Sequence, residues 1–277
     1  MISKDVEKRI LSLAYVPEHI PKLMCFLSGG DVEFIDDNYL IFIGQNWLIL
    51  IAYPLKHQFD LKEVEVYINY SIRQYKPRYL WLLTPSLPEA LTNQFRKLED
   101  DWYFKIDIPA KIDKRLIKIV EKFKDNFKIS FDRTFTEQHL ELIEEFLKTK
   151  AVADNIKQLY TRLPHYVKNS ETAFFLNSYN KYGKLTAFYI VEMAAEKFSG
   201  YMIGCTSKIN YAPYSSDLLM YELIKLSEKE KKSFINLGIG VNEGIRRFKK
   251  KWGGVPFLKY ETYEYKEYGI LNYFLMR

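Results

Sequence analysis

Short β-rich runs alternate with amphipathic helical runs along this 277-residue sequence, and this alternation leaves open few folds other than a sheet flanked by helices. In the first half, strands are predicted at residues 39–43, 47–55, 79–83 and 102–108, and helices at 60–75 and 89–97. Asp60 is a good N-cap for the helix that follows it, and Gly44-Gln45-Asn46 suits a hairpin between the first two strands.

The second half repeats this order of elements. A charged helical run at 111–128 is interpreted as the connection between the halves, and helices are predicted at 136–149, 155–166, 215–229 and 243–252. Further strands are predicted at 172–177, 185–193, 200–205, 233–237 and 257–265. We therefore predict an α/β (α+β) protein of two similar units, 1–125 and 126–277, each a mixed, mostly antiparallel sheet flanked by helices. No repeat at the level of residues is visible, so the duplication is inferred from element order.

Composition excludes several classes of protein. The 22 Tyr and 19 Phe exclude extensive disorder. The net charge of +6 arises from interspersed charges and does not by itself indicate nucleic-acid binding. Cys25 and Cys205 lie far apart with no CxxC or His-rich neighbour, so they predict neither a disulfide framework nor a metal site. No apolar run is long enough for a signal peptide or a membrane span, and we expect a cytoplasmic protein.

A helix start at Pro213-Tyr214-Ser215-Ser216-Asp217 precedes the apolar periodic run of residues 218–226. The backbone N–H groups of a helix start are unpaired and carry a partial positive charge, which suits a phosphate or carboxylate. Ordinary capping explains the same residues, and most helix starts look like this.

Three glycines follow the strand at 233–237, in the order Gly238, Gly240, Gly244. Glu243 stands where a dinucleotide-binding GxGxxG motif needs its third glycine, so that fold is disfavoured. Such glycines let a ligand approach the backbone closely, and a plain turn explains them equally well.

The helix predicted at 243–252 carries five cations, and a helical wheel separates one of them from the others. Lys249 shares a face with Ile245, Phe248 and Trp252, whereas Arg246, Arg247, Lys250 and Lys251 are expected to face solvent. A lysine beside a buried aromatic stripe either extends along it to water or meets an anion, because burying an unpaired ammonium costs several kcal/mol. Both interpretations of Lys249 remain open here.

The segment from Asn236-Leu237-Gly238 through Gly244-Ile245-Arg246-Arg247-Phe248-Lys249 to Gly253-Gly254 resembles the carboxy-terminal signature of the Fem-like branch of the Gcn5-related N-acetyltransferase (GNAT) superfamily. The resemblance covers about 65 residues well and the second half loosely. It implies two GNAT-like domains, the first degenerate, and an N-acyltransferase that moves an acyl group from acyl-CoA or aminoacyl-tRNA to a small-molecule or peptide amine.

The same resemblance implies where the donor binds, namely between two splayed strands of the second half. The fourth strand of that fold corresponds to residues 200–205, and the phosphate cradle to 208–216. The donor-binding residues expected are Ile203, Cys205, Tyr214, Ser215, Ser216, Asn236, Asn242, Phe248 and Lys249. The superfamily's glycine-containing cradle is absent, because Asn210-Tyr211-Ala212-Pro213-Tyr214-Ser215-Ser216 has no glycine.

Acyl transfer to an amine requires a proton acceptor and a group that stabilises a tetrahedral oxyanion. The candidates near the implied site are Glu192, Tyr201 and Tyr214. Glu192 can equally be a carboxylate at the rim of a sheet. Cys205 has no Cys-His motif near it and is predicted to be a buried thiol.

Three functions follow from this reasoning. The first is an acyl-CoA-dependent N-acyltransferase, the second an aminoacyl-tRNA-dependent transferase, and the third a binding protein that keeps the fold without the chemistry. The missing glycine cradle favours the third. The absence of a long coiled-coil arm disfavours the second, although the basic run from Arg246 to Lys251 could contact a polyanion such as tRNA.

Overall fold

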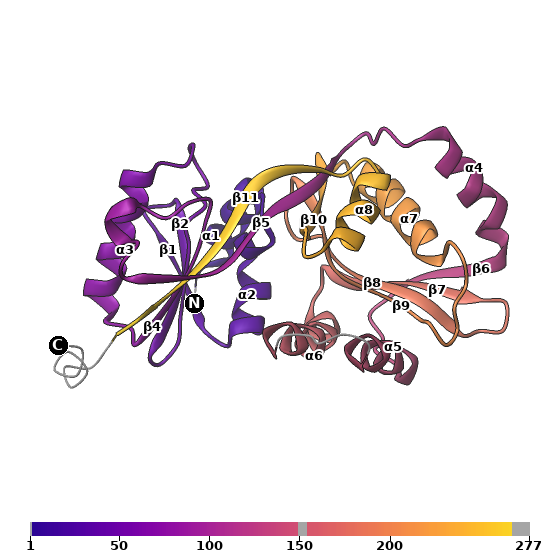
Figure 1. Cartoon of the computed structure of the whole chain (residues 1–277), viewed down its shortest axis with the longest axis horizontal. Helices are drawn as coiled ribbons and strands as arrows, with labels where there is room; N and C mark the ends of the chain where they lie inside the picture. The colour runs from indigo at the N-terminus through magenta and orange to yellow at the C-terminus, as the bar shows by residue number, and fades with distance from the viewer. Residues whose placement is uncertain (1, 149–153, 268–277) are drawn as a thin grey trace.

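The computed structural model describes residues 2–148 and 154–267. Within these residues the strands form one 11-stranded sheet, in the order β1-β2-β3-β4-β11-β5-β10-β9-β8-β7-β6. Neighbouring strands are antiparallel except for β3 with β4 and β9 with β10, which are parallel. Helices cover both faces (Figure 1), so the predicted mixed, mostly antiparallel sheet flanked by helices is confirmed.

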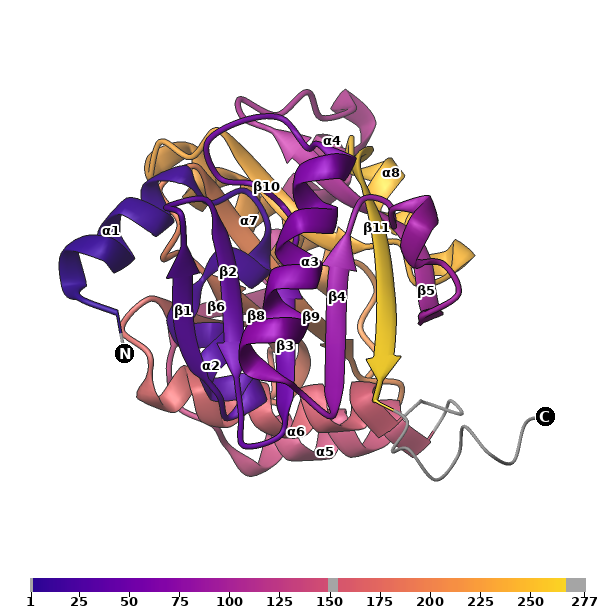
Figure 2. The ribbon, with the colours of Figure 1, turned by 90° about the vertical axis from the view of Figure 1, so that its left-hand side faces the viewer.

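The first part of the chain builds one end of this sheet. Its elements are α1 (Lys4–Leu13), α2 (Pro21–Ser28), β1 (Asp31–Ile35), β2 (Tyr39–Ile43), β3 (Trp47–Ile51), α3 (Leu61–Tyr75) and β4 (Tyr79–Thr84). Asp60 caps α3 as predicted, since its carboxylate accepts from the Lys62 and Glu63 N–H groups. The alternation of β2 places Tyr39 and Ile41 against α3 on one face and Leu40 and Phe42 against α1 on the other. Figure 2 shows α3 lying across these strands.

The remaining elements build the other end. They are α4 (Lys114–Phe123), β6 (Phe127–Asp132), α5 (Glu137–Lys148), α6 (Asp154–Asn169), β7 (Ala173–Asn180), β8 (Leu185–Glu192), β9 (Phe198–Thr206), α7 (Ser215–Lys229), β10 (Phe234–Ile239) and α8 (Glu243–Lys251). One apolar core packs α5 and α6 on one face, and another packs α4, α7 and α8 on the opposite face. Every residue of β8 is buried because both faces of that strand are covered.

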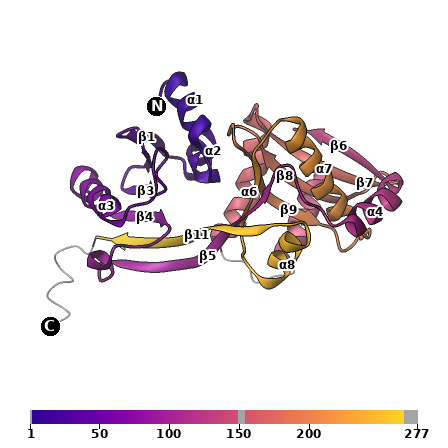
Figure 3. The same cartoon turned by 90° about the horizontal axis from the view of Figure 1, so that it is seen from above.

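Two long strands, β5 (Phe95–Asp107) and β11 (Val255–Lys266), join the two ends (Figures 1 and 3). They pair with each other along most of their length, and β11 also pairs with β4. The last described strand therefore lies between two strands from the first half of the chain. The division into units 1–125 and 126–277 stays a prediction, and any such boundary has to account for this returning strand.

Several predicted boundaries differ from the structure. The predicted helix at 89–97 is a 3-10 turn, Glu89–Leu91, after which β5 begins at Phe95. The helix predicted at 111–128 ends at Phe123. A 3-10 turn, Lys124–Asn126, follows it and leads into the edge strand β6. Charged residues continue into β6, an edge strand in which no residue is fully buried, and this concealed the change of period. The helix predicted to end at Thr149 is described to Lys148, and Thr149 lies outside the described residues.

None of the helices within residues 2–148 and 154–267 combines the length and the apolar character that a bilayer crossing requires.

Candidate active site

Strands β9 and β10 diverge after a short paired stretch. Their parallel pairing runs from Phe198 and Phe234 to Gly200 and Asn236 and ends there. Beyond Asn236, Gly238 takes a left-handed conformation with φ of +70°, and β10 also pairs irregularly with β5 between Asn236 and Ile239. The crevice predicted between these strands is therefore present.

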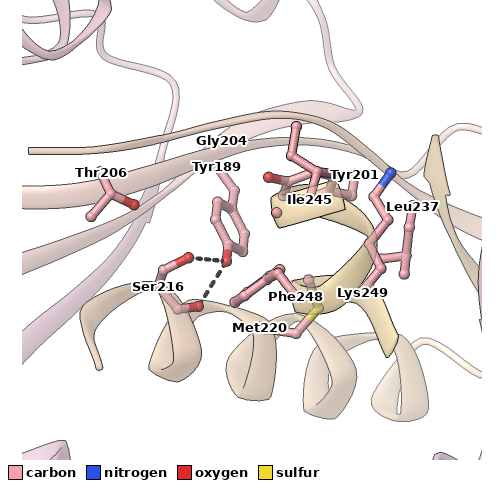
Figure 4. A pocket seen from close by; sticks show the side chains of 11 residues that line it. Tyr189, Tyr201, Gly204, Thr206, Ser216, Met220, Leu237, Ile245, Phe248 and Lys249 are labelled. Atoms are coloured by element: carbon pink, nitrogen blue, oxygen red, sulfur yellow. Dashed lines mark hydrogen bonds between the residues drawn. The ribbon is translucent and has the colours of Figure 1, made fainter. Parts of the chain in front are cut away.

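A cavity of about 170 Å³ occupies this crevice (Figure 4). Strands β8, β9 and β10 form one side, and helices α7 and α8 form the other. Its walls are mainly aromatic and aliphatic, with a few hydroxyl groups and one amine, which is typical of a small-molecule site. The lining residues are Tyr189, Tyr201, Gly204, Thr206, Ser216, Met220, Leu237, Gly244, Ile245, Phe248 and Lys249.

The sheet side of the cavity is organised around two tyrosines. The rings of Tyr189 and Tyr201 meet edge to face with centroids 4.7 Å apart. The Tyr189 hydroxyl lies 2.7 Å from both the carbonyl oxygen and the Oγ of Ser216, which joins β8 to the first turn of α7. Burial raises the pKa of Tyr201 above its ordinary range, so its hydroxyl remains protonated at neutral pH and is suited to donate a hydrogen bond.

Gly204 leaves room between these tyrosines. A Cβ at this position would overlap the Tyr201 hydroxyl and lie 2.9 Å from the Tyr189 ring. We expect Gly204→Ala to displace both rings into the cavity and weaken ligand binding at least about tenfold, the equivalent of about 1.4 kcal/mol. Calorimetric titration of the variant against a bound ligand measures this loss. Gly200→Ala on the same strand is the control, because its Cβ would meet the flexible Met202 Sδ at 3.2 Å and would otherwise make ordinary contacts with Glu192 at 3.6 Å. Equal losses in the two variants would contradict the assignment.

Helix α8 places Lys249 at the other side of the cavity. The residue is only 3% exposed, and its Nζ donates a 2.5 Å hydrogen bond to the Ile239 carbonyl. The Phe104 ring lies with its centroid 5.7 Å from Nζ. Burial lowers the pKa of Lys249 to about 7, whereas nearby Asp101 raises it and Arg246 lowers it further. The inward orientation predicted for Lys249 is confirmed, and its amine is poised to change charge near neutral pH.

Local sequence explains why α8 occupies this position. The Asn242 side chain accepts a hydrogen bond from the Ile245 N–H at 3.0 Å and so caps the helix. At the other end, Asp217 on α7 accepts from the Trp252 indole N–H at 3.0 Å and from Lys251 Nζ at 2.7 Å. These contacts fix α8 against α7, with Phe248 between them.

Of the residues predicted from the sequence, the cavity brings together Tyr201, Ser216, Phe248 and Lys249. Glu192 does not line it. Its carboxylate is buried near the opposite face of β8, where it accepts from the Tyr166 hydroxyl at 2.5 Å and from the Ala194 N–H at 2.8 Å. The prediction that Glu192 is a proton acceptor therefore has no support from the geometry of this cavity.

The remaining predicted residues lie around the cavity without lining it. Ile203 and Cys205 belong to the core of α5 and α6 on the far face of β9, and burial raises the pKa of Cys205. Asn236 joins β10 to the carbonyl of Tyr15, at 3.2 Å. Tyr214 adopts a left-handed conformation before α7, and its ring stacks on Phe123 of α4 with centroids 4.7 Å apart.

Ser215 differs from its neighbours because its Oγ is buried and, within the part of the chain that the structure describes, has no hydrogen-bond partner. Buried polar atoms are normally paired, so an unsatisfied hydroxyl in the first turn of a helix calls for an explanation. Ser215 does not line the cavity, so a ligand bound there does not provide this hydroxyl with a partner.

Sequence reasoning missed Tyr189, Thr206, Met220 and Leu237, which also line the cavity. Strict alternation from Tyr201 would place Ile203 and Cys205 on the cavity face of β9. A β-bulge between Tyr201 and Ile203 reverses the alternation, so Gly204 and Thr206 line the cavity instead, and Tyr189 on β8 is opposite Gly204. The bulge and the pairing register are set by tertiary structure.

Within residues 2–148 and 154–267, no group of three or more His, Cys, Asp or Glu side chains is placed to hold a metal ion.

Comparison with known proteins places this geometry in a fold class. No protein-family model matches the sequence, and no curated protein matches it. Among solved structures, FemX is similar over 100% of this chain and 98% of its own, with a TM-score of 0.62 and 10% identity. The L-PGS from Bacillus licheniformis is similar over 90% of this chain and 88% of its own, with a TM-score of 0.54 and 15% identity. A GCN5-related N-acetyltransferase from Kribbella flavida is similar over 98% and 99%, with a TM-score of 0.53 and 10% identity.

These similarities define the class: the chain has a GNAT-like, Fem-type fold. The resemblance drawn from residues 236–254 is thereby confirmed at the level of the fold. Of the three structures named here, the one from Kribbella flavida carries the name of an N-acetyltransferase.

Proposed function

We propose that this protein is an N-acyltransferase that moves an acyl group from acyl-CoA to an amine on a small molecule or peptide. The observation that supports this most strongly is the cavity between the diverging strands β9 and β10, bordered by Phe248 and Lys249. In a GNAT-like fold this crevice is the place expected for the donor, and the sequence resemblance implied the same two residues.

The chemistry proposed for the cavity uses the groups that line it. The neutral amine of the acceptor attacks the acyl carbonyl, a C–N bond forms, and the C–S bond to the thiol leaving group breaks. The Tyr201 hydroxyl and protonated Lys249 are suited to stabilise the oxyanion, because both are hydrogen-bond donors among the residues that line the cavity. The proton released by the amine passes to solvent or to the leaving thiolate, which balances the step.

A second function uses an aminoacyl-tRNA donor. It is favoured by exposed cations on α4 and α8, among them Lys114, Lys118, Lys122 and Arg247, for which no ion pair is found among the described residues. A solvated helix face explains the same cations, and most such faces have no partner. We therefore keep acyl-CoA as the donor in the main proposal.

Ligand-induced stabilisation tests the proposal. The protein is heated with CoA, acetyl-CoA, a long-chain acyl-CoA or aminoacyl-tRNA, and its melting temperature is recorded. A ligand at a hundred times its dissociation constant stabilises a fold by about 2.7 kcal/mol, so a saturating rise with an acyl-CoA is expected. A rise with aminoacyl-tRNA alone would establish the second function, and no rise with any of the four would indicate a binding protein without this chemistry.

Two lysine variants test whether the donor binds in the cavity. Lys249→Ala should weaken donor binding by about tenfold or more, since it removes the only amine among the lining residues. Lys250→Ala is the matched control, because Lys250 follows it on the same helix and is exposed. Calorimetric dissociation constants for both variants provide the comparison. Equal effects would refute the assignment of Lys249 to the donor site.

A further inference from the structure

An ion pair ties α8 to β5 beside the cavity. Asp101 of β5 is only 8% exposed, and its Oδ1 accepts a hydrogen bond from Arg246 Nη2 at 3.1 Å. Its Oδ2 accepts from the backbone N–H of Val241 at 2.6 Å. A single carboxylate therefore contacts both the helix and the loop that leads into it, from a position 140 residues away from Val241 in sequence.

The loop between β10 and α8 is strained, and Asp101 holds it. Val241 has φ of +58°, a left-handed conformation that is unfavourable for a β-branched residue. Gly240 precedes it, and a Cβ there would lie 2.7 Å from Asp101 Oδ1, so only glycine allows the carboxylate to approach so closely. Strain of this kind persists only where the surroundings impose it.

The conformation of this loop sets the position of the cavity wall. The loop ends at Asn242, the N-cap of α8, and the first turns of that helix carry Ile245, Phe248 and Lys249 into the cavity. A change at Asp101 is therefore transmitted to residues that do not touch it.

Asp101 and Arg246 are also the charges that act on Lys249. Among the described residues no carboxylate forms an ion pair with Lys249; the negative charge of Asp101 favours the charged form of its amine, and the positive charge of Arg246 opposes it. Of the elements packed around it, β10 contributes no titratable side chain, and the Asp217 carboxylate of α7 is occupied by Lys251 and Trp252. Titratable groups on the other elements include Asp101 and Lys105 on β5, Tyr189 on β8, Tyr201 on β9, and Arg246 and Lys250 on α8. Of these, Asp101 and Arg246 shift the pKa of Lys249.

We infer that Asp101 is a positioning residue for the cavity: it holds the β10–α8 loop in its strained form through Val241 and Arg246, and its negative charge opposes the effect of Arg246 on the Lys249 amine. The inference rests on the proposed function for the role of Lys249 in acyl transfer. The effect on the charge of Lys249 does not depend on any reaction, and it can be measured on the unliganded protein.

Nuclear magnetic resonance on protein labelled with ¹³C at the lysine ε carbons measures this effect, with the Lys249 signal identified by its loss in Lys249→Met. In the wild type the Lys249 signal should titrate with a pKa of about 7. Asp101→Asn removes a negative charge and should lower that pKa, and Arg246→Gln removes a positive charge and should raise it, each by about 0.5 to 1. Lys250→Gln removes an exposed charge from the same helix and should change it much less.

Opposite shifts distinguish this role from a purely structural one. If Asp101 only supported the fold, Asp101→Asn and Arg246→Gln would disturb α8 alike, and the pKa of Lys249 would move in one direction in both. That result, or a pKa unchanged in Asp101→Asn, would overturn the inference. The double variant Asp101→Asn/Arg246→Gln should return close to the wild-type pKa, because the two charge effects cancel.

Activity measurements separate this inference from the proposed function. If the protein turns over an acyl-CoA, the pH dependence of the rate should reflect the pKa of Lys249. In each variant the midpoint of this pH dependence should then shift in the same direction as the pKa of Lys249. Opposite pKa shifts without any acyl-CoA binding would leave the charge role of Asp101 intact and would refute the proposed donor.

Discussion

Replacing Lys249 with methionine should raise the free energy of unfolding relative to the wild type most at low pH, and this difference should shrink as the pH rises. The pKa of Lys249 is about 7 in the folded protein and 10.5 for an ordinary lysine, so between these values the unfolded chain binds more protons. Below pH 7 the wild type is therefore destabilised by the full cost of burying a charged ammonium, and this destabilisation has disappeared by about pH 10.5. Methionine has a similar volume and no charge to bury.

The expected slope is steep enough to measure. The difference in unfolding free energy between Lys249→Met and wild type should fall by up to about 1.4 kcal/mol per pH unit across this window. Urea unfolding at about pH 6, 8 and 10 provides the values. Lys250→Met is the control, since its exposed amine should give a nearly flat difference. A pH-independent difference for Lys249→Met would show that Lys249 is charged in the fold throughout this range.

Replacing Trp252 with alanine should destabilise the protein by about 3–5 kcal/mol, the range for large buried aromatic residues. The side chain is fully buried, packs in the core between α7 and the sheet, and donates through its indole N–H to Asp217 at 3.0 Å. Its loss would leave a cavity and remove one donor from the Asp217 carboxylate. Because this contact fixes the end of α8, ligand binding should weaken together with stability.

Trp102 is the matched comparison for this result. It is 45% exposed on β5, so Trp102→Ala should cost much less, about 1 kcal/mol. Denaturant unfolding of both variants, and of Trp252→Phe as an intermediate change, tests the order. Similar losses for Trp252→Ala and Trp102→Ala would contradict the packing role given to Trp252.

Local sequence patterns were sufficient to predict the elements in which apolar residues recur with a clear helical or strand period. The helix at 215–229 was predicted with the bounds that the structure has, because its apolar residues recur at helical spacing after a polar start. The amphipathic wheel of α8 correctly placed Lys249 inward, although Arg246, expected to face solvent, is partly buried by its ion pair with Asp101. Edge strand β6 was missed because its residues alternate weakly and continue a charged helix.

The residues of the candidate site likewise include some that a local pattern could predict and others that it could not. Phe248 and Lys249 could be predicted because they lie on one helix, whose geometry relates neighbouring residues directly. Glu192 was placed near the site because it ends a strand, but side chains on a strand alternate between faces, and Glu192 belongs to the face covered by α6. Tyr189, Thr206 and Met220 come from three different elements, and nothing local connects them.

Sequence alone was enough to establish the mixed α/β class, most helices and strands of the second half, and the inward lysine of α8, because each depends on periods of two or 3.6 residues within one segment. Only the tertiary structure decided that β11 returns between β4 and β5, that β9 and β10 separate after Gly200, and that Asp101 holds the loop before α8. These features depend on contacts between residues far apart in the chain, which are selected by packing and hydrogen bonding in the folded state and leave no repeating local pattern.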